Sequence, residues 1–159
     1  MKKITTFLSL LCAAVFAQNS AIIVDSAQLE NIPWLSYGEA LDEAKEDKKI
    51  VLIEFYAKWC IPCHEMEKTV FRDPEVLSEL KSNFHFVKLD IEKKDTILCE
   101  GERLLTPTCV RNWELGGVPA FAVVGREKGD IRHLSIGDYK KRPFLRFLNA
   151  IKSKEQGKN

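Results

Sequence analysis

The pattern of apolar and polar positions predicts a mixed α/β domain. Residues 50–56 form a nearly continuous β-prone run, which is typical of a strand covered on both faces. A second strand is predicted over residues 84–91. Residues 118–124 and 131–136 are predicted to form a hairpin around the turn at 125–130.

Helix signals occupy the intervals between these strands. Ser36 and Glu39 have the spacing of a capping box, and they open a helix that we expect to end near Asp47. Asp73 and Pro74 form an N-cap followed by a first-turn proline. Further helices are predicted over residues 60–69, 106–113 and 141–152. Because a helix joins the first two core strands, these strands should be parallel, within a small mixed sheet flanked by helices on both faces.

The N-terminus has the features of a secretory signal peptide. Lys2 and Lys3 precede an uncharged, mostly apolar run over residues 4–16, and small residues follow up to Ala17, where we expect cleavage. An uncleaved anchor or a buried helix is the alternative. Residues 21–24 are a candidate edge strand. The expected division is a signal peptide at 1–17, a lead-in at 18–33, one domain at 34–152 and a flexible tail at 153–159.

Composition excludes two classes of protein. The chain has 159 residues, 45% of them hydrophobic, and 24 Lys and Arg stand against 23 Asp and Glu. This balance argues against a large basic surface for nucleic acid. No apolar run reaches the ~20 residues that cross a bilayer, which excludes a polytopic membrane protein. A single exported domain remains.

Two cysteines at the start of a predicted helix indicate redox chemistry. Cys60 and Cys63 lie on one helical face, close enough to form a disulfide. The helix N-terminus should lower the pKa of Cys60 below the ~8.5 of a free thiol, so Cys60 is the candidate nucleophile and Cys63 the resolving thiol. Pro62 fits the first turn, where its missing N–H costs nothing.

Glu54 and Pro119 are candidate partners of this pair. Glu54 interrupts the apolar run of residues 50–56, and burial would raise its pKa so that it exchanges protons near neutral pH. An outward-facing Glu54 with an ordinary pKa is the alternative. The Val118–Pro119 bond is a candidate cis peptide because it precedes a proline. Without further information, the trans form is favoured at this position. The backbone of Val118 would be available to an extended substrate.

Several separated motifs resemble the thioredoxin superfamily. They are the run at 51–63, the strand residues 87–90, Gly117-Val118-Pro119 and Gly137. Ala40-Leu41 with Ala44-Lys45, and Met66-Glu67 with residues 70–74, resemble exported thioredoxin-like proteins close to the C-terminal domain of the electron-transfer protein DsbD. The resemblance spans about residues 34–152 and implies a thioredoxin fold.

The resemblance also assigns roles to individual residues. It implies Cys60 as nucleophile, Cys63 as resolving thiol and Pro119 as cis. Glu54 stands where thioredoxin has a buried Asp, and Lys88 matches a lysine beside that acid. The candidate substrate contacts are Trp59, Ile61, Pro62, Val118 and Pro119. No cofactor is implied.

Cys99 lies within an insertion at about residues 95–108, and Cys109 directly follows it; the polar stretch from Lys93 to Thr106 is expected to be irregular. A structural disulfide is the favoured interpretation, and a second redox pair or two free thiols are the alternatives. Zinc or copper binding by the four thiols is disfavoured, because nine residues separate Cys99 from Cys109 and a structural metal site usually takes its ligands as close pairs.

The expected function is that of an exported, periplasmic thiol–disulfide oxidoreductase working mainly as a reductase. The resemblance implies a membrane electron donor of the DsbD type. Protein disulfides are the expected substrates, with apocytochrome c among the candidates. An oxidase or isomerase of the same fold and a redox-silent binding module are the alternatives.

Overall fold

The computed structural model describes residues 31–156. The signal peptide expected at 1–17 and the edge strand expected at 21–24 lie outside these described residues, as do residues 157–159. Within the described range, no helix combines the length and the apolar character needed to cross a membrane.

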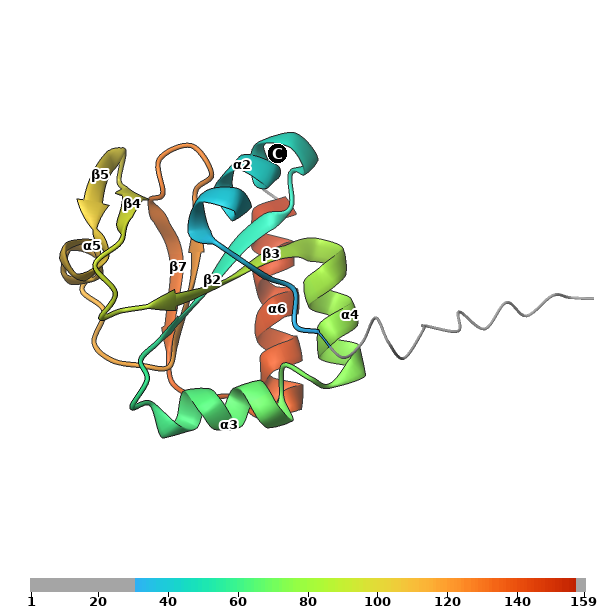
Figure 1. Cartoon of the computed structure of the whole chain (residues 1–159). Helices are drawn as coiled ribbons and strands as arrows, with labels where there is room; N and C mark the ends of the chain where they lie inside the picture. Colours follow the sequence, from blue (N-terminus) through green and yellow to red (C-terminus); the bar gives the residue numbers. More distant parts are fainter. Residues whose placement is uncertain (1–30, 157–159) are drawn as a thin grey trace, which may run out of the picture.

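A five-stranded mixed sheet forms the centre of the molecule (Figure 1). In spatial order its strands are β1 (Trp34–Leu35), β3 (Phe84–Asp90), β2 (Ile50–Tyr56), β6 (Ala120–Val124) and β7 (Ile131–Ile136). Strands β1, β3 and β2 are parallel to one another, and β6 is antiparallel to both of its neighbours. The predicted parallel pair and C-terminal hairpin are therefore confirmed, whereas the short strand β1 was not expected.

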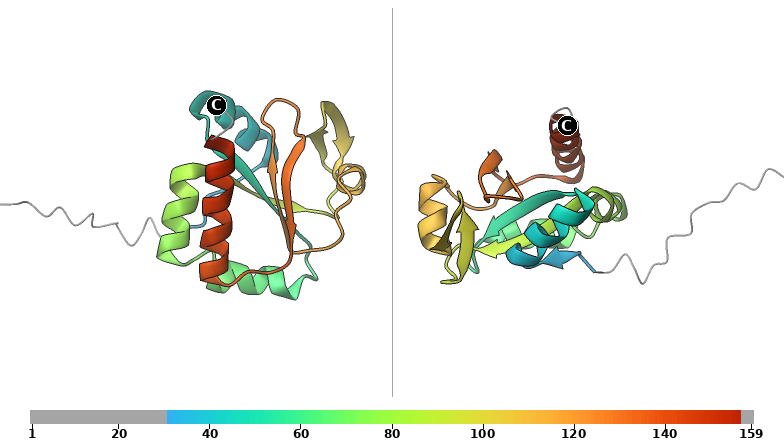
Figure 2. Two further views of the ribbon diagram at one scale, coloured as in Figure 1. Left: turned by 180° about the vertical axis from the view of Figure 1, so that it is seen from behind. Right: turned by 90° about the horizontal axis from the view of Figure 1, so that it is seen from above.

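Helices cover both faces of this sheet. They are α2 (Tyr37–Asp47), α3 (Ile61–Thr69), α4 (Pro74–Asn83), α5 (Thr106–Asn112) and α6 (Lys141–Gln156). Residues of α2 and α5 pack on one face, and residues of α3, α4 and α6 pack on the other. Figure 2 shows α2 and α6 on opposite sides of the sheet. The predicted mixed sheet with helices on both faces is confirmed.

Local capping explains where two of these helices begin. Ser36 Oγ accepts a hydrogen bond from the backbone N–H of Glu39, and a Glu39 carboxyl oxygen accepts one from the backbone N–H of Ser36. Asp73 accepts hydrogen bonds from the backbone N–H groups of Glu75 and Val76 at the start of α4. Both N-termini match the sequence-based predictions.

Alternation along β2 divides its side chains between two apolar clusters. Val51, Ile53 and Phe55 face the α2 side, whereas Leu52 faces the α3–α4–α6 side. Since successive strand residues point to opposite faces, Glu54 shares the side of Leu52. The strand is covered on both faces, as predicted, and Glu54 is therefore buried.

The stretch expected to be irregular is a β-hairpin, which corrects the prediction. Strand β4 (Thr96–Cys99) pairs antiparallel with β5 (Glu102–Leu105). Glu100 and Gly101 form the two-residue turn with φ values of 54° and 91°. Two consecutive positive φ angles suit the right-handed twist of paired strands. The Glu-Gly turn was the signal that the polar composition obscured.

The C-terminal prediction also needs correction, because α6 continues to Gln156 instead of ending near residue 152. An ion pair accompanies the additional turn: Glu155 Oε2 lies 3.1 Å from Arg132 Nη1 on β7. Residues 153–156 are thus helical and not part of a flexible tail.

Three segments converge where the β6–β7 turn meets the β4–β5 hairpin. Tyr37 Oη donates to the Leu98 carbonyl at 2.9 Å, and the Gly101 N–H donates to the Lys128 carbonyl at 2.7 Å. Gly129 has a φ of 65°, and a Cβ there would lie 2.5 Å from Leu98 O and 2.6 Å from Tyr37 Oη. Only glycine allows this approach.

Candidate functional site

The Cys60–Cys63 pair lies where strand β2 gives way to helix α3. After Tyr56 a tight turn closes with a hydrogen bond from Cys60 N–H to Ala57 O at 3.0 Å. Cys60 is the N-cap of α3, and its Sγ accepts a hydrogen bond from the Cys63 N–H at 3.2 Å. The two cysteines form a disulfide with a Cα–Cα distance of 5.4 Å. A sulfur at the N-terminus of a helix that accepts a hydrogen bond from a backbone N–H is suited to carry negative charge after reduction of the disulfide.

The disulfide is covered, although its neighbours in the sequence are exposed. Cys60 and Cys63 are 1% and 2% exposed, with Tyr56, Ile91 and Val118 packed against them. By contrast, Trp59 is 63% exposed and Ile61 is 73% exposed. Pro62 is also exposed. The site thus presents an apolar rim around sulfurs that are shielded from solvent.

Trp59 directly precedes Cys60, and Val118, the residue before Pro119, packs against the cysteines from a second loop. Trp59 Nε1 donates to Glu92 Oε1 at 3.1 Å, which holds the exposed indole against the loop after β3. The Val118–Pro119 peptide bond is cis, the isomer that the family resemblance implies. The Pro119 carbonyl accepts a hydrogen bond from Gly137 N–H at 2.9 Å, which ties this loop to the end of β7.

Glu54 is a fully buried acid on the α3 side of the sheet. Its exposed fraction is 0%, and neither carboxyl oxygen has a hydrogen-bond partner among the described residues. Desolvation raises the pKa of Glu54 to about 8, the charge of Lys88 opposes this rise, and the charge of Glu67 adds to it. The outward-facing alternative is wrong, and the acid can exchange a proton near neutral pH.

Lys88 lies beside Glu54 in the β2–β3 register but is bonded to a different acid. Its Nζ makes an ion pair with Glu67 Oε2 and stands 4.5 Å from the centre of the Tyr56 ring. Glu67 therefore holds the lysine whose charge favours ionised Glu54, and the charge of Glu67 itself opposes that effect. Glu67 was not among the predicted site residues, although it follows Cys63 by four residues and so lies on the same helical face.

Cys99 and Cys109 form a second disulfide, which connects the end of β4 to helix α5. Both cysteines are buried in the cluster that contains Phe55 and Trp113. The four cysteines of the described residues are therefore paired in two separate bonds, and the alternative of free thiols does not match this structure.

Comparisons with known proteins agree with this fold and site. The sequence pattern of a family described as thioredoxin-like matches residues 33–125. The chain is 33% identical over 99 residues to the thiol:disulfide interchange protein DsbD of Vibrio vulnificus, which covers 60% of this chain and 16% of that protein. It is 33% identical over 107 residues to DsbD of Pseudomonas fluorescens, covering 67% and 17%. The chain thus spans a small part of the length of these relatives.

Solved structures give the same result. A thioredoxin from Thermus thermophilus superposes with a TM-score of 0.64 at 21% identity, covering 78% of this chain and 89% of that one. The reduced C-terminal domain of Neisseria meningitidis DsbD superposes with a TM-score of 0.54 at 26% identity, covering 70% and 90%. The chain belongs to the thioredoxin-like family.

Proposed function

We propose that this protein is an exported thiol–disulfide oxidoreductase that acts mainly as a disulfide reductase through Cys60 and Cys63. The observation that carries the proposal is the placement of Cys60 Sγ at the N-terminus of α3, where it accepts the Cys63 N–H, six residues after the buried acid Glu54 of strand β2. This setting favours a thiolate and supplies a nearby group for proton exchange.

The reaction proceeds by two thiol–disulfide exchanges. The Cys60 thiolate attacks one sulfur of a client disulfide, and the other client sulfur leaves as a thiolate. Cys63, after losing its proton, then attacks the Cys60 sulfur and releases the second client thiol. The client gains two electrons, and the protein is left with the Cys60–Cys63 disulfide.

Glu54 is the proposed proton acceptor for Cys63. With its pKa raised to about 8 by desolvation, Glu54 is partly ionised near neutral pH and accepts or returns a proton without a large energetic cost. Lys88 acts through its charge, which favours the ionised form of Glu54. Glu67 limits that effect because it is paired with the lysine.

The apolar rim is the proposed contact surface for the client. Trp59, Ile61 and Pro62 are exposed around the covered disulfide, and Val118 packs against it. An extended client segment would pair with the Val118 backbone next to Pro119. Cys99–Cys109 is proposed as a structural disulfide outside the exchange cycle.

Relatives named for thiol:disulfide interchange support a redox partnership. The proposed donor is a membrane protein of the DsbD type that returns two electrons to Cys60–Cys63 in the periplasm, after removal of the signal peptide. Mispaired protein disulfides and apocytochrome c are the proposed clients.

Two measurements test this function. Wild-type protein should reduce insulin, Cys60→Ser should lose turnover, and Cys63→Ala should trap a mixed disulfide with insulin at Cys60. The reduction potential should lie nearer the thioredoxin value of about −270 mV than the strong-oxidant value of about −120 mV. Equal turnover by Cys60→Ser would favour a redox-silent module, and a potential above about −150 mV would favour an oxidase.

A further inference from the structure

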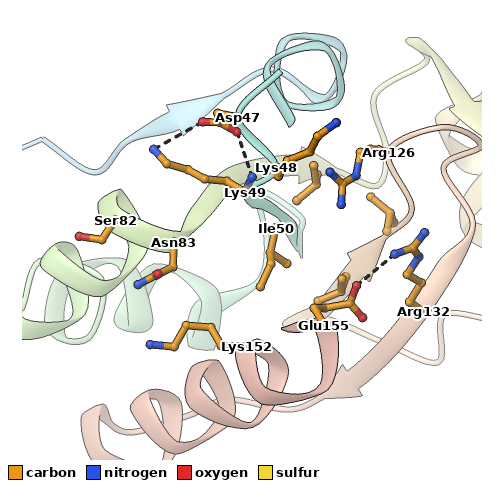
Figure 3. Close-up of a pocket in the computed structure, with 13 residues that line it drawn as sticks. Asp47, Lys48, Lys49, Ile50, Ser82, Asn83, Arg126, Arg132, Lys152 and Glu155 are labelled. Atoms are coloured by element: carbon orange, nitrogen blue, oxygen red, sulfur yellow. Dashed lines mark hydrogen bonds and ion pairs between the residues drawn. The ribbon is translucent and has the colours of Figure 1, made fainter. Parts of the chain in front are cut away.

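A pocket of about 400 Å³ lies at the end of the sheet opposite the dithiol (Figure 3). Strand β2 begins at Ile50 in this pocket and ends at Tyr56, just before the turn that carries Cys60. At ~3.3 Å per strand residue the two places are roughly 20 Å apart. A ligand here would not occupy the client surface around Trp59 and Ile61.

The pocket is strongly cationic, although the chain is almost neutral. The whole sequence has a formal net charge of +1. Two carboxylates line the pocket, those of Asp47 and Glu155. Its cationic lining residues are Lys48, Lys49, Arg126, Arg132 and Lys152. Positive charge is therefore concentrated at this end of the molecule.

Three of these cations already have carboxylate partners. Lys49 Nζ lies 3.7 Å from Asp47, and Arg132 Nη1 lies 3.1 Å from Glu155. Lys152 is paired with Glu79. The remaining two, Lys48 and Arg126, have no carboxylate within ion-pair distance in the range 31–156. Their charges are available to an incoming anion.

Lys48 and Arg126 are held next to each other by one carbonyl. The backbone N–H of Lys48 donates to Ala44 O at 3.2 Å, and Arg126 Nη1 donates to the same oxygen at 3.2 Å. Lys48 Nζ also donates to the Lys45 carbonyl at 2.7 Å. These bonds position an ammonium and a guanidinium at one wall of the pocket before any ligand arrives, which reduces the ordering cost of binding.

The remaining lining suits a small ligand with one highly charged group. Ile50 and Val124 give the pocket an apolar floor, while Ser82 and Asn83 add polar groups at the α4 side. An arginine fork beside a lysine matches the several acceptor oxygens of a phosphate. The volume falls within the range of small-molecule sites. We propose that this pocket binds a small phosphate-bearing anion, with Arg126 and Lys48 as its principal contacts.

The experiment is a calorimetric titration of the purified protein with pyrophosphate. We expect saturable binding at one site, and a Kd at least about tenfold higher in Arg126→Gln and in Lys48→Asn, because each variant removes one charge-assisted contact. Asn tolerates the left-handed conformation of residue 48, whose φ is 65°. The matched control is Lys94→Gln, which removes one charge from an exposed lysine that does not line this pocket.

Amide shifts in ¹⁵N spectra locate the site, and vesicles containing phosphatidylglycerol identify the source of the phosphate. Shifts confined to the pocket residues support the proposal. Vesicle binding that pyrophosphate displaces assigns the phosphate to a lipid headgroup, and binding of soluble pyrophosphate alone assigns it to a free metabolite. Variants that lower the melting temperature without changing pyrophosphate affinity, or equal weakening by Lys94→Gln, overturn the proposal and leave these cations as helix C-terminal charges only.

Discussion

The two disulfides have similar burial and very different surroundings. Cys60–Cys63 spans three residues at a helix N-terminus, follows the strand that carries buried Glu54, and has an exposed apolar rim. Cys99–Cys109 spans ten residues and joins a hairpin to the middle of α5. Glu100 and Glu102, the acids nearest to Cys99 in the sequence, are exposed.

If Cys60–Cys63 is the redox-active pair and Cys99–Cys109 the structural one, as proposed, burial alone does not separate the two kinds of disulfide. The distinguishing features are a backbone N–H directed at the sulfur and, on the preceding strand, a buried acid whose pKa is raised by desolvation. Both features come from the segment of strand β2, the following turn and helix α3. The reactivity of the cysteines is therefore determined by this segment around them.

Removing the Cys99–Cys109 disulfide tests most directly whether the two disulfides have different roles. Cys99→Ala with Cys109→Ala should lower the free energy of unfolding by about 3 kcal/mol, because the closed loop of the unfolded chain is released. Urea unfolding measures this loss. Insulin turnover by the double variant should equal that of wild type, and loss of turnover in a folded variant would instead make Cys99–Cys109 an electron relay.

Glu54→Gln tests the role of the buried acid through the pH dependence of the free energy of unfolding. The pKa of folded Glu54 is raised by desolvation from 4.5 to about 8, so the folded protein keeps a proton that the unfolded chain releases between these values. The free energy of unfolding of the oxidised wild type should therefore fall as pH rises, and the fall should end above about pH 8. Between pH 5 and 7, wild type should lose about 2–3 kcal/mol relative to Glu54→Gln.

The measurement is urea unfolding of both proteins at half-unit pH steps. Other titrating groups affect both proteins alike, so the difference between the curves isolates Glu54. A difference that does not change with pH would mean that Glu54 titrates at its ordinary pKa and has no role as a proton acceptor near neutral pH.

Glu67→Gln has the smallest expected effect. It removes a negative charge that raises the pKa of Glu54 and frees Lys88, whose charge lowers it. The pH at which the stability loss ends should move down by about one unit. Glu65→Gln is the matched control, because Glu65 is an exposed residue of α3 that pairs with Lys68 at 3.3 Å. An identical shift in both variants would mean that the effect comes from the total charge of helix α3 and not from the ion pair between Glu67 and Lys88.

Local signals in the sequence were sufficient for much of the fold and the centre of the site. The capping box at Ser36 and the apolar run ending at Tyr56 each depend on neighbouring residues, and both were predicted correctly. The burial of Glu54 followed from its position inside that run.

What the sequence did not reveal depends on contacts distant in the chain. Strand β1 has two residues and exists through its pairing with β3. The last turn of α6 coincides with a contact between Glu155 and Arg132. Glu67 joins the site through its ion pair with Lys88, which lies 21 residues further along the chain. Spacing from Cys63 was the available clue to Glu67, and it does not reveal the partner.

The lack of a side chain at Gly129 affects the thermal stability of the protein. The bare α-carbon of Gly129 lies where a methyl group would collide with Leu98 O and Tyr37 Oη. Gly129→Ala would push the β4–β5 hairpin and helix α2 away from the β6–β7 turn. It would leave the four cysteines and their neighbouring residues unchanged. This variant should therefore unfold at a lower temperature than wild type, although no residue of the Cys60–Cys63 site has been changed.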